Sequence, residues 1–438
     1  MTLAEDLQLN SSARDTAPPL TTYEQLRLAA LSEITNRNVD SRDVRAVEQV
    51  VRSLVTEYQR RSDLGQSRRL ADPAAVVQRL MRSITKAGPF QKYVDDPTMS
   101  TDVMFYGDQI TFTGPDGRQH VDEEPTCEAE LLGIVQRLLA DAGASVDLEN
   151  PIVVKMVLGN RVRLSASIPP VSDRLDGTMR VYRAKQTTLA ELVGLGAITP
   201  LAANVLTASQ RTQVGVLLTG GPSSGKSTAL QAMLLAIPST TTIRIVQEVR
   251  ELAAPHLPGG RWSPEAGDLT IRDLIKRALQ FAPRALAVGE TLGAEAFELL
   301  KAGNAGCSFL TTLHANSAQL GMQSLVSAAL MAGSNVSSAD VRQTFSQLID
   351  FVIHCEAEPV HLVPEGGRQR RQVMEICVVP PQIAPTGFVL EPIFRREDFG
   401  QPLEFVGHHF PQELERRINR ALPNGMTLRD ITERGATL

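Results

Sequence analysis

The segment that decides the fold reads VGVLLTGGPSSGKSTAL over residues 214–230. Its centre matches the phosphate-loop pattern G-x-x-x-x-G-K-[ST]. The apolar run before it predicts a strand over 214–219, and the residues after it predict a helix over 224–237. Glycines let the N–H groups of such a loop turn inward around an anion, and the helix N-terminus adds a positive dipole.

This context predicts a nucleotide-binding loop that takes ATP and Mg²⁺ as its ligands. In it, Lys226 reaches the β and γ phosphates and the Ser227 hydroxyl ligates the metal. The residues that we assign to the loop are Gly220, Gly221, Pro222, Ser223, Ser224, Gly225, Lys226, Ser227 and Thr228.

Strand and helix signals alternate after the loop. Strands are expected at 243–247, 285–288 and 309–312, and helices at 273–281, 294–302 and 321–332. Such alternation predicts an α/β fold with a mostly parallel sheet that helices cover on both faces. Further along, antiparallel strands are expected around 373–379 and 388–394, followed by a short helix at 411–421.

Two polar residues end expected strands of this sheet. Glu290 follows the apolar run 285–288, and His314 follows the run 309–313. Ligands of open α/β sheets bind at the carboxyl ends of the strands, so both side chains are expected beside Lys226. Glu290 could hold a Mg²⁺-bound water or orient the attacking one, and His314 could donate a hydrogen bond to a γ-phosphate. The simpler alternatives are a solvated carboxylate and a polar strand terminus.

The pattern along the whole chain predicts four parts. Residues 1–21 are polar and are expected to form a disordered tail. Helical periodicity marks 22–87 as a helical segment, and short apolar runs around one strong helix mark 88–185 as a separate α+β domain. The remaining stretch, 186–438, carries the phosphate loop and the alternating elements.

Composition excludes several classes of protein. The formal net charge is −5 and aromatic residues make up 4%, so direct nucleic-acid binding is not expected. The four Cys residues contain no CxxC pair, which argues against a disulfide framework or a zinc site. Neither an apolar run of membrane-spanning length nor a signal peptide is visible, so a reducing cytosol is the expected compartment.

Several motifs together resemble the type II/type IV secretion ATPases, and most closely the tight-adherence (Flp) pilus assembly branch. They are the loop 220–228, the run 285–290 and the segment TTLHANS at 311–317. The resemblance implies a RecA-like motor domain behind a smaller N-terminal domain. It also implies a cytosolic homo-hexamer that hydrolyses ATP and acts peripherally, at the inner face of the cell membrane, on a platform protein of a pilus or secretion machine.

The resemblance implies further site residues in the N-terminal domain. Two arginines of this family approach the phosphates, and the matching positions are Arg163 and Arg180. Guanidinium forks suit phosphate oxygens. Arg161 and Arg183 lie close enough in sequence to compete for the assignment.

The chain departs from the family pattern within the catalytic boxes. The family's catalytic Glu falls on Gln247 without a gap and on Glu248 with a one-residue slip. Leu292 replaces an arginine, and Cys307 stands at the first histidine of the histidine box. We therefore expect ATP to bind, with Glu248, Glu290 and His314 as catalytic candidates.

Three functions stay open, of which the first is the leading one and the departures motivate the second. The first is an ATP-hydrolysing motor, whose turnover the departures could slow. The second is a nucleotide-binding structural or regulatory subunit with little turnover. The third is a motor for conjugative transfer.

Overall fold

The computed structural model describes residues 21–183, 186–263, 269–333, 337–385, 387–407 and 409–438. The chain divides into two compact units, Met1–Tyr182 and Arg183–Leu438, which we call unit 1 and unit 2 and describe separately. The expected tail lies outside the described residues except for its last position, as do residues 184 and 185 at the expected domain boundary.

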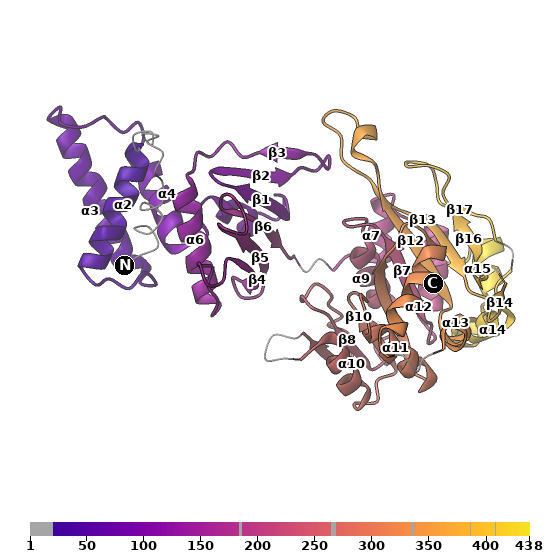
Figure 1. The fold of residues 1–438 in the computed structure, drawn as a ribbon. Helices are drawn as coiled ribbons and strands as arrows, with labels where there is room; N and C mark the ends of the chain where they lie inside the picture. Colours follow the sequence, from indigo (N-terminus) through magenta and orange to yellow (C-terminus); the bar gives the residue numbers. More distant parts are fainter. Residues whose placement is uncertain (1–20, 184–185, 264–268, 334–336, 386, 408) are drawn as a thin grey trace. The chain divides into compact units, whose positions relative to one another are not determined.

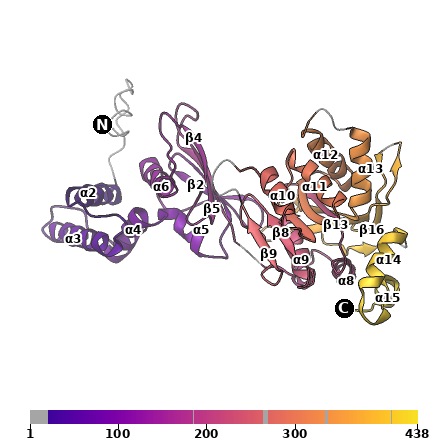
Figure 2. The ribbon, with the colours of Figure 1, turned by 90° about the horizontal axis from the view of Figure 1, so that it is seen from below.

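The first described elements of unit 1 are three helices that share one apolar core (Figure 2). Leu26, Val47 and Leu80 are among the side chains buried between them. Asp72 caps the third helix by accepting a hydrogen bond from an N–H of its first turn, which satisfies a donor that the helix leaves open. The three helices are α2 (Thr22–Asn36), α3 (Val44–Asp63) and α4 (Pro73–Thr85).

The rest of unit 1 is a six-stranded antiparallel sheet with strand order β3-β2-β1-β6-β5-β4. One face packs against α6 (Glu128–Asp141), whose Leu131, Ile134 and Leu138 share a core with Leu164. The opposite face presents polar and exposed side chains, as the alternating burial along β5 shows. The strands are β1 (Asp102–Tyr106), β2 (Gln109–Thr113), β3 (Gln119–Val121), β4 (Ile152–Val157), β5 (Val162–Ser167) and β6 (Asp176–Val181), and η1 (Gly88–Phe90) and α5 (Gln91–Asp95) precede them.

Unit 2 is built on a nine-stranded sheet with strand order β17-β16-β13-β12-β7-β11-β10-β8-β9. The strands from β12 to β9 are parallel, and β13, β16 and β17 extend the sheet in antiparallel fashion. β10 and β11 lie between β7 and β8, although β8 follows β7 in the chain. This order, with the strand before the loop at the centre, is RecA-like, and the expected antiparallel extension is confirmed.

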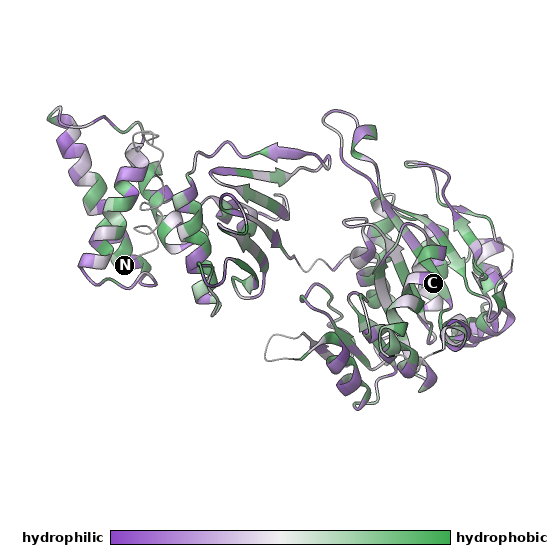
Figure 3. Ribbon diagram, viewed as in Figure 1, coloured by the Kyte–Doolittle hydropathy of each residue, from purple (hydrophilic) through white to green (hydrophobic). Residues whose placement is uncertain are grey.

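Helices cover both faces of this sheet, as the alternating pattern predicts (Figure 1). α8 and α9 share one apolar core with the strands, and α10 to α13 share the other. The strands are largely hydrophobic, whereas α10 shows a hydrophilic outer side (Figure 3). Within the described part of the chain, no helix is long and apolar enough to span a membrane.

The helices of unit 2 are α7 (Leu189–Gly194), α8 (Pro200–Ser209), α9 (Lys226–Ala236), α10 (Ile271–Leu279), α11 (Glu295–Asn304), α12 (Ala318–Leu330), α13 (Ser338–Leu348), η2 (Val360–Leu362), α14 (Gln412–Ala421), η3 (Pro423–Gly425) and α15 (Leu428–Arg434). Its strands are β7 (Val216–Gly220), β8 (Ile243–Val246), β9 (Gly259–Trp262), β10 (Ala285–Val288), β11 (Ser308–His314), β12 (Phe351–Ala357), β13 (Arg371–Val378), β14 (Ile383–Ala384), β15 (Gly387–Phe388), β16 (Glu391–Arg395) and β17 (Glu404–Phe405).

An ion pair ties α14 to the amino ends of the central strands. Arg417 contacts the Asp350 carboxylate and also donates to the carbonyl of Gln213. Asp350 accepts a hydrogen bond from the N–H of Gly215, just before β7. Burial raises the pKa of Asp350, and the Arg417 guanidinium opposes that rise.

We predict that Arg417→Ala destabilises unit 2 by about 3–5 kcal/mol, because it leaves the buried carboxylate without its cation. Arg416→Ala is the matched control, since Arg416 forms an exposed pair with Glu413 worth at most about 1 kcal/mol. Denaturant unfolding measures both. Equal stability of the two variants would show that the Asp350 pair contributes nothing to the fold.

Candidate active site

The loop between β7 and α9 has the backbone that the sequence pattern predicts. Gly225 has a φ of +95° and precedes the first residue of α9. Gly220 has a φ of +150°, and a Cβ built there would lie 2.1 Å from the carbonyl oxygen of Cys355. Only glycine therefore lets β12 approach this closely. The loop ends at a helix N-terminus, where N–H groups and the helix dipole favour an anion.

The Lys226 side chain is folded back onto this loop. Only 6% of the residue is exposed, and its Nζ lies 2.9 Å from the carbonyl oxygen of Gly220 and 2.6 Å from that of Gly221. A third contact of 3.3 Å joins Nζ to Nδ1 of His314. A buried ammonium needs such acceptors. Phosphate oxygens are stronger acceptors than neutral carbonyls, so an anion in the loop would compete for this cation.

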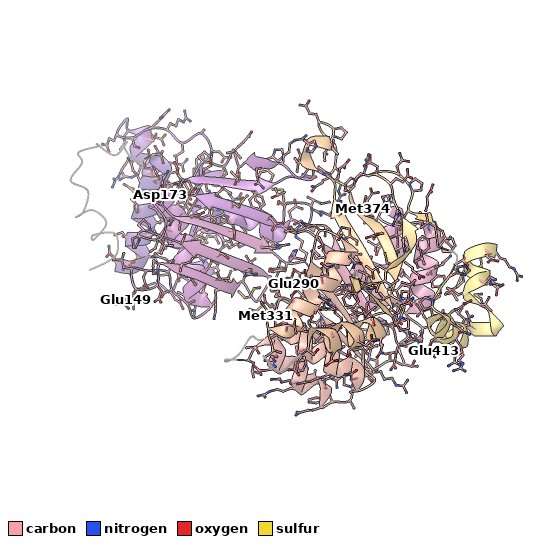
Figure 4. All side chains as sticks on the ribbon, turned by 45° about the vertical axis from the view of Figure 1, so that its right-hand side comes forward. Glu149, Asp173, Glu290, Met331, Met374 and Glu413 are labelled. Atoms are coloured by element: carbon pink, nitrogen blue, oxygen red, sulfur yellow. The ribbon has the colours of Figure 1, made fainter. Side chains whose placement is uncertain are left out.

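Glu290 and His314 lie at the same edge of the sheet, as the sequence predicts. Nε2 of His314 is 2.8 Å from Oε1 of Glu290. An ionised carboxylate only accepts, so this nitrogen carries the proton, and Nδ1 is left to accept from Lys226. Glu290, labelled in Figure 4, keeps 37% of its side chain exposed and is open to a ligand or a water. The three side chains thus form one connected polar group.

The remaining loop side chains offer hydroxyl groups. Ser224 is 3% exposed, and its Oγ is one of the few buried side-chain atoms in the described residues that lack a hydrogen-bond partner. Ser227 lies in the first turn of α9 and is half-buried, whereas Thr228 is exposed. An orphaned hydroxyl inside an anion-binding loop fits a ligand oxygen better than a packing role.

The oxygen donors present fit Mg²⁺ when it accompanies a phosphate ligand. No cluster of three or more His, Cys, Asp or Glu residues suited to a metal occurs among the described residues. Mg²⁺ typically takes one or two protein oxygens, with phosphates and waters completing the shell. The Ser227 hydroxyl and the Glu290 carboxylate are the oxygens that this edge supplies.

Gln247 and Glu248 follow β8 at the same edge but have different surroundings. Gln247 is 2% exposed, its Oε1 accepts from the N–H of Leu252 at 2.7 Å, and its Nε2 donates to the carbonyl of Leu252 at 3.1 Å. Its amide is thus committed to the backbone of the next loop. Glu248 is exposed. Val246, the last residue of β8, pairs with Val288, the last residue of β10, so Glu248 and Glu290 each follow their strand by two residues at the same edge of the sheet.

Leu292 and Cys307, the two other departures from the family pattern, lie far apart in burial and position. Leu292 is 59% exposed, two residues beyond Glu290. Cys307 is 5% exposed in an apolar core, where burial raises the pKa of its thiol to about 12. It precedes the seven-residue strand β11, so roughly 20 Å of strand separates it from His314. Cys307 thus lies at the opposite end of β11 from His314, and its effect on hydrolysis stays a prediction.

Arg163 and Arg180 belong to unit 1 and are direct partners on β5 and β6. Both are exposed, and Nε of Arg180 lies 3.5 Å from Oδ1 of Asp102. Like charges directly opposite each other destabilise a sheet, which an anion bound between them would reverse. Arg161 instead donates to the carbonyl of Val94 at 3.1 Å. This contact favours Arg163 over Arg161, and the phosphate-binding role of the pair stays a prediction.

The sequence reasoning missed one buried polar residue beside the loop. His354 is 4% exposed on β12, and its Nδ1 lies 2.9 Å from Oγ1 of Thr219. The available signal was a single histidine inside the apolar run 351–355. Periodicity does not show which strand lies next to β7, so the neighbourhood of this histidine could not be foreseen.

We predict that Gln247→Glu destabilises the protein by about 1–3 kcal/mol, because a carboxylate cannot donate to the carbonyl of Leu252. Glu248→Gln, at the adjacent exposed position, should change stability by at most about 0.5 kcal/mol. Denaturant midpoints of the two variants check this. A stable Gln247→Glu variant would reopen position 247 as a catalytic candidate.

Comparisons with known proteins agree with these observations. A family model described as type II/IV secretion system protein matches residues 150–380, more than half of the chain. A putative conjugal transfer protein of Mycobacterium tuberculosis is 36% identical over 204 residues, or 43% of this chain and 57% of that relative. The chain thus spans little more than half of that relative's length. The type IV secretion system protein VirB11 of Bartonella quintana is 22% identical over 319 residues, or 62% of this chain and 88% of that relative.

Solved structures that this chain matches include the VirB11 ATPase of Brucella suis and the ADP-bound pilus retraction motor PilT. The first has a TM-score of 0.35 at 18% identity, over 70% of this chain and 97% of its own. The second has a TM-score of 0.46 at 22% identity, over 62% of this chain and 77% of its own. On the evidence of the matching family model, this chain belongs to the type II/IV secretion system protein family.

Proposed function

We propose that the chain binds ATP with Mg²⁺ at the loop 220–228, hydrolyses it, and acts as a motor subunit of a secretion or pilus machine. The observation that carries the proposal is the buried Lys226 ammonium, held in an anion-binding loop and joined through His314 to Glu290. If Lys226 served only to stabilise the fold, its contact with His314 would not need to lead on to the partly exposed carboxylate of Glu290.

The loop residues would bind the phosphates in the following way. N–H groups at the start of α9 face the anion, and Lys226 exchanges its carbonyl contacts for phosphate oxygens. The Ser227 hydroxyl and Glu290 would hold Mg²⁺, which supplies positive charge that stabilises the phosphoryl group during transfer. His314 would report the change, since any movement of Lys226 alters the contact at its Nδ1.

Glu248 is the proposed base for hydrolysis. It is exposed and, like Glu290, follows its strand by two residues at the same sheet edge, whereas the amide of Gln247 is committed to Leu252. The catalysis then consists of positioning a water and stabilising charge, with little covalent chemistry for the protein to perform. Glu290 remains the alternative base because its carboxylate is also accessible.

Arg163 and Arg180 are proposed as additional phosphate contacts from unit 1. Their support is the in-register pairing of two exposed guanidinium groups. Two forks side by side suit an anion that carries several charges.

The oligomeric state, the partner protein and the pathway are further proposals. A homo-hexamer at the inner face of the membrane, acting on a platform protein, follows from the resemblance stated above. The tight-adherence branch remains our first assignment of the pathway. The conjugal transfer name of the 36% identical relative supports conjugative secretion as the second candidate. A subunit with little turnover is the third, and the kinetics of the wild type distinguish it from the other two.

We predict that Lys226→Ala abolishes measurable ATP binding, because the loop loses the cation that reaches the phosphates. Lys155→Ala, which removes an exposed lysine of β4 in unit 1, is the control for net charge and should bind normally. Calorimetric titration decides the point. Unchanged affinity in Lys226→Ala would refute the proposed site.

We predict that Glu248→Gln retains ATP affinity but lowers kcat by about 10²–10⁴-fold, the usual contribution of a general base. Glu251→Gln, three residues along, should stay within a few-fold of the wild type. Steady-state phosphate release measures both. If Glu248→Gln turns over normally, the base lies elsewhere, with Glu290 as the first candidate.

A further inference from the structure

A buried histidine lies directly behind the phosphate loop and has no part in the roles proposed so far. His354 is 4% exposed, and in the parallel pairing of β12 with β7 it stands opposite Thr219. Thr219 is the last residue before Gly220, the first residue of the loop. A buried imidazole at this position calls for an explanation, because an apolar side chain would fill the space without needing partners.

The two hydrogen bonds of His354 fix its orientation. Nε2 lies 3.0 Å from Oε1 of Glu356, and an ionised carboxylate only accepts, so Nε2 carries the proton. With the proton at Nε2, Nδ1 is placed to accept from the hydroxyl of Thr219, 2.9 Å away. Glu356 keeps 43% of its side chain exposed. The three groups therefore connect the partly exposed carboxylate of Glu356, near the end of β12, to the start of the loop.

This connection continues into the candidate active site. The carbonyl of Gly220 accepts from Nζ of Lys226, which also contacts His314, and His314 contacts Glu290. The backbones of β7 and β12 approach closely at Gly220, since the carbonyl of Cys355 occupies the space where a Cβ at this position would lie. The Thr219–His354 bond thus joins the same two strands one residue before the loop begins.

The strand geometry supports a specific role for His354. The pairing of β12 with β13 shifts register between His354 and Cys355, and such bulges redirect side chains near functional sites. β13 carries Met374, labelled in Figure 4. On the other side of Thr219, a Cβ on Gly321 of α12 would lie 2.2 Å from its Cγ2. The methyl group of Thr219 therefore packs against α12, and its hydroxyl is hydrogen-bonded to His354.

We propose that His354 is a positioning residue of the nucleotide site, which holds Thr219 and thereby sets the position of Gly220 and the resting place of Lys226. The inference rests on the proposed function, since it concerns the same loop and its polyphosphate ligand. His354 touches no phosphate; it acts through the Thr219 hydroxyl. Its loss should weaken binding more than it slows the chemical step.

The test compares Thr219→Val, which keeps the shape and loses the hydroxyl, with Thr219→Ser, which keeps the hydroxyl. Calorimetry with Mg-ATP should show about a fivefold to tenfold higher Kd for Thr219→Val, the effect of one lost buried hydrogen bond, and a value near the wild type for Thr219→Ser. Thr207→Val is the matched control, since its hydroxyl donates to the Ala203 carbonyl within α8. In steady-state assays, KM should rise more than kcat falls.

A double-mutant cycle with His354→Gln tests the proposed route. If His354 acts through Thr219, the double variant binds ATP no more weakly than the worse single variant. Additive effects, wild-type affinity of Thr219→Val, or failure of Thr219→Ser to restore binding would each overturn the inference while leaving the proposed function intact. A wild type that binds no ATP would overturn both.

Discussion

The structure at the carboxyl ends of the parallel strands in unit 2 depends on one buried positive charge, the ammonium of Lys226. With 6% of the residue exposed, it cannot rely on water and takes acceptors from the loop carbonyls and from His314. The RecA-like strand order makes this possible, because β12 and β11 flank β7 and bring their carboxyl ends to the same place. β12 can lie this close to β7 only because position 220 is a glycine, since a Cβ there would clash with the carbonyl of Cys355.

Both histidines at this edge are used in the same way. Each has an acidic neighbour that orients its Nε2 proton, so that Nδ1 accepts: His314 from Lys226, and His354 from Thr219. The polar groups of β12, β7, α9, β11 and β10 are thus joined in one line across the sheet edge. In the proposed function, Lys226 within that line meets the phosphates and Glu290 at one end meets the metal, while the other end reaches the surface at Glu356.

The sequence predicted the alternating fold of unit 2 and the placement of Lys226, Glu290 and His314, because a strand that ends in a polar residue is visible in a local pattern. The surroundings of Gln247 and His354 were not predictable, since their partners at Leu252 and Thr219 depend on loop geometry and strand order. The position of Cys307 was not predictable for a related reason: alignment to a box does not reveal which end of β11 a residue occupies. The proposed roles of Arg163 and Arg180 remain predictions.

The most direct measurement is a crystal structure of the chain with Mg²⁺ and a non-hydrolysable ATP analogue. The account predicts phosphate oxygens within hydrogen-bonding distance of Nζ of Lys226, with at least one of its contacts to the carbonyls of Gly220 and Gly221 broken and the Ser227 hydroxyl on the metal. An analogue bound elsewhere, or a Lys226 that keeps both carbonyl contacts beside an occupied loop, would contradict it.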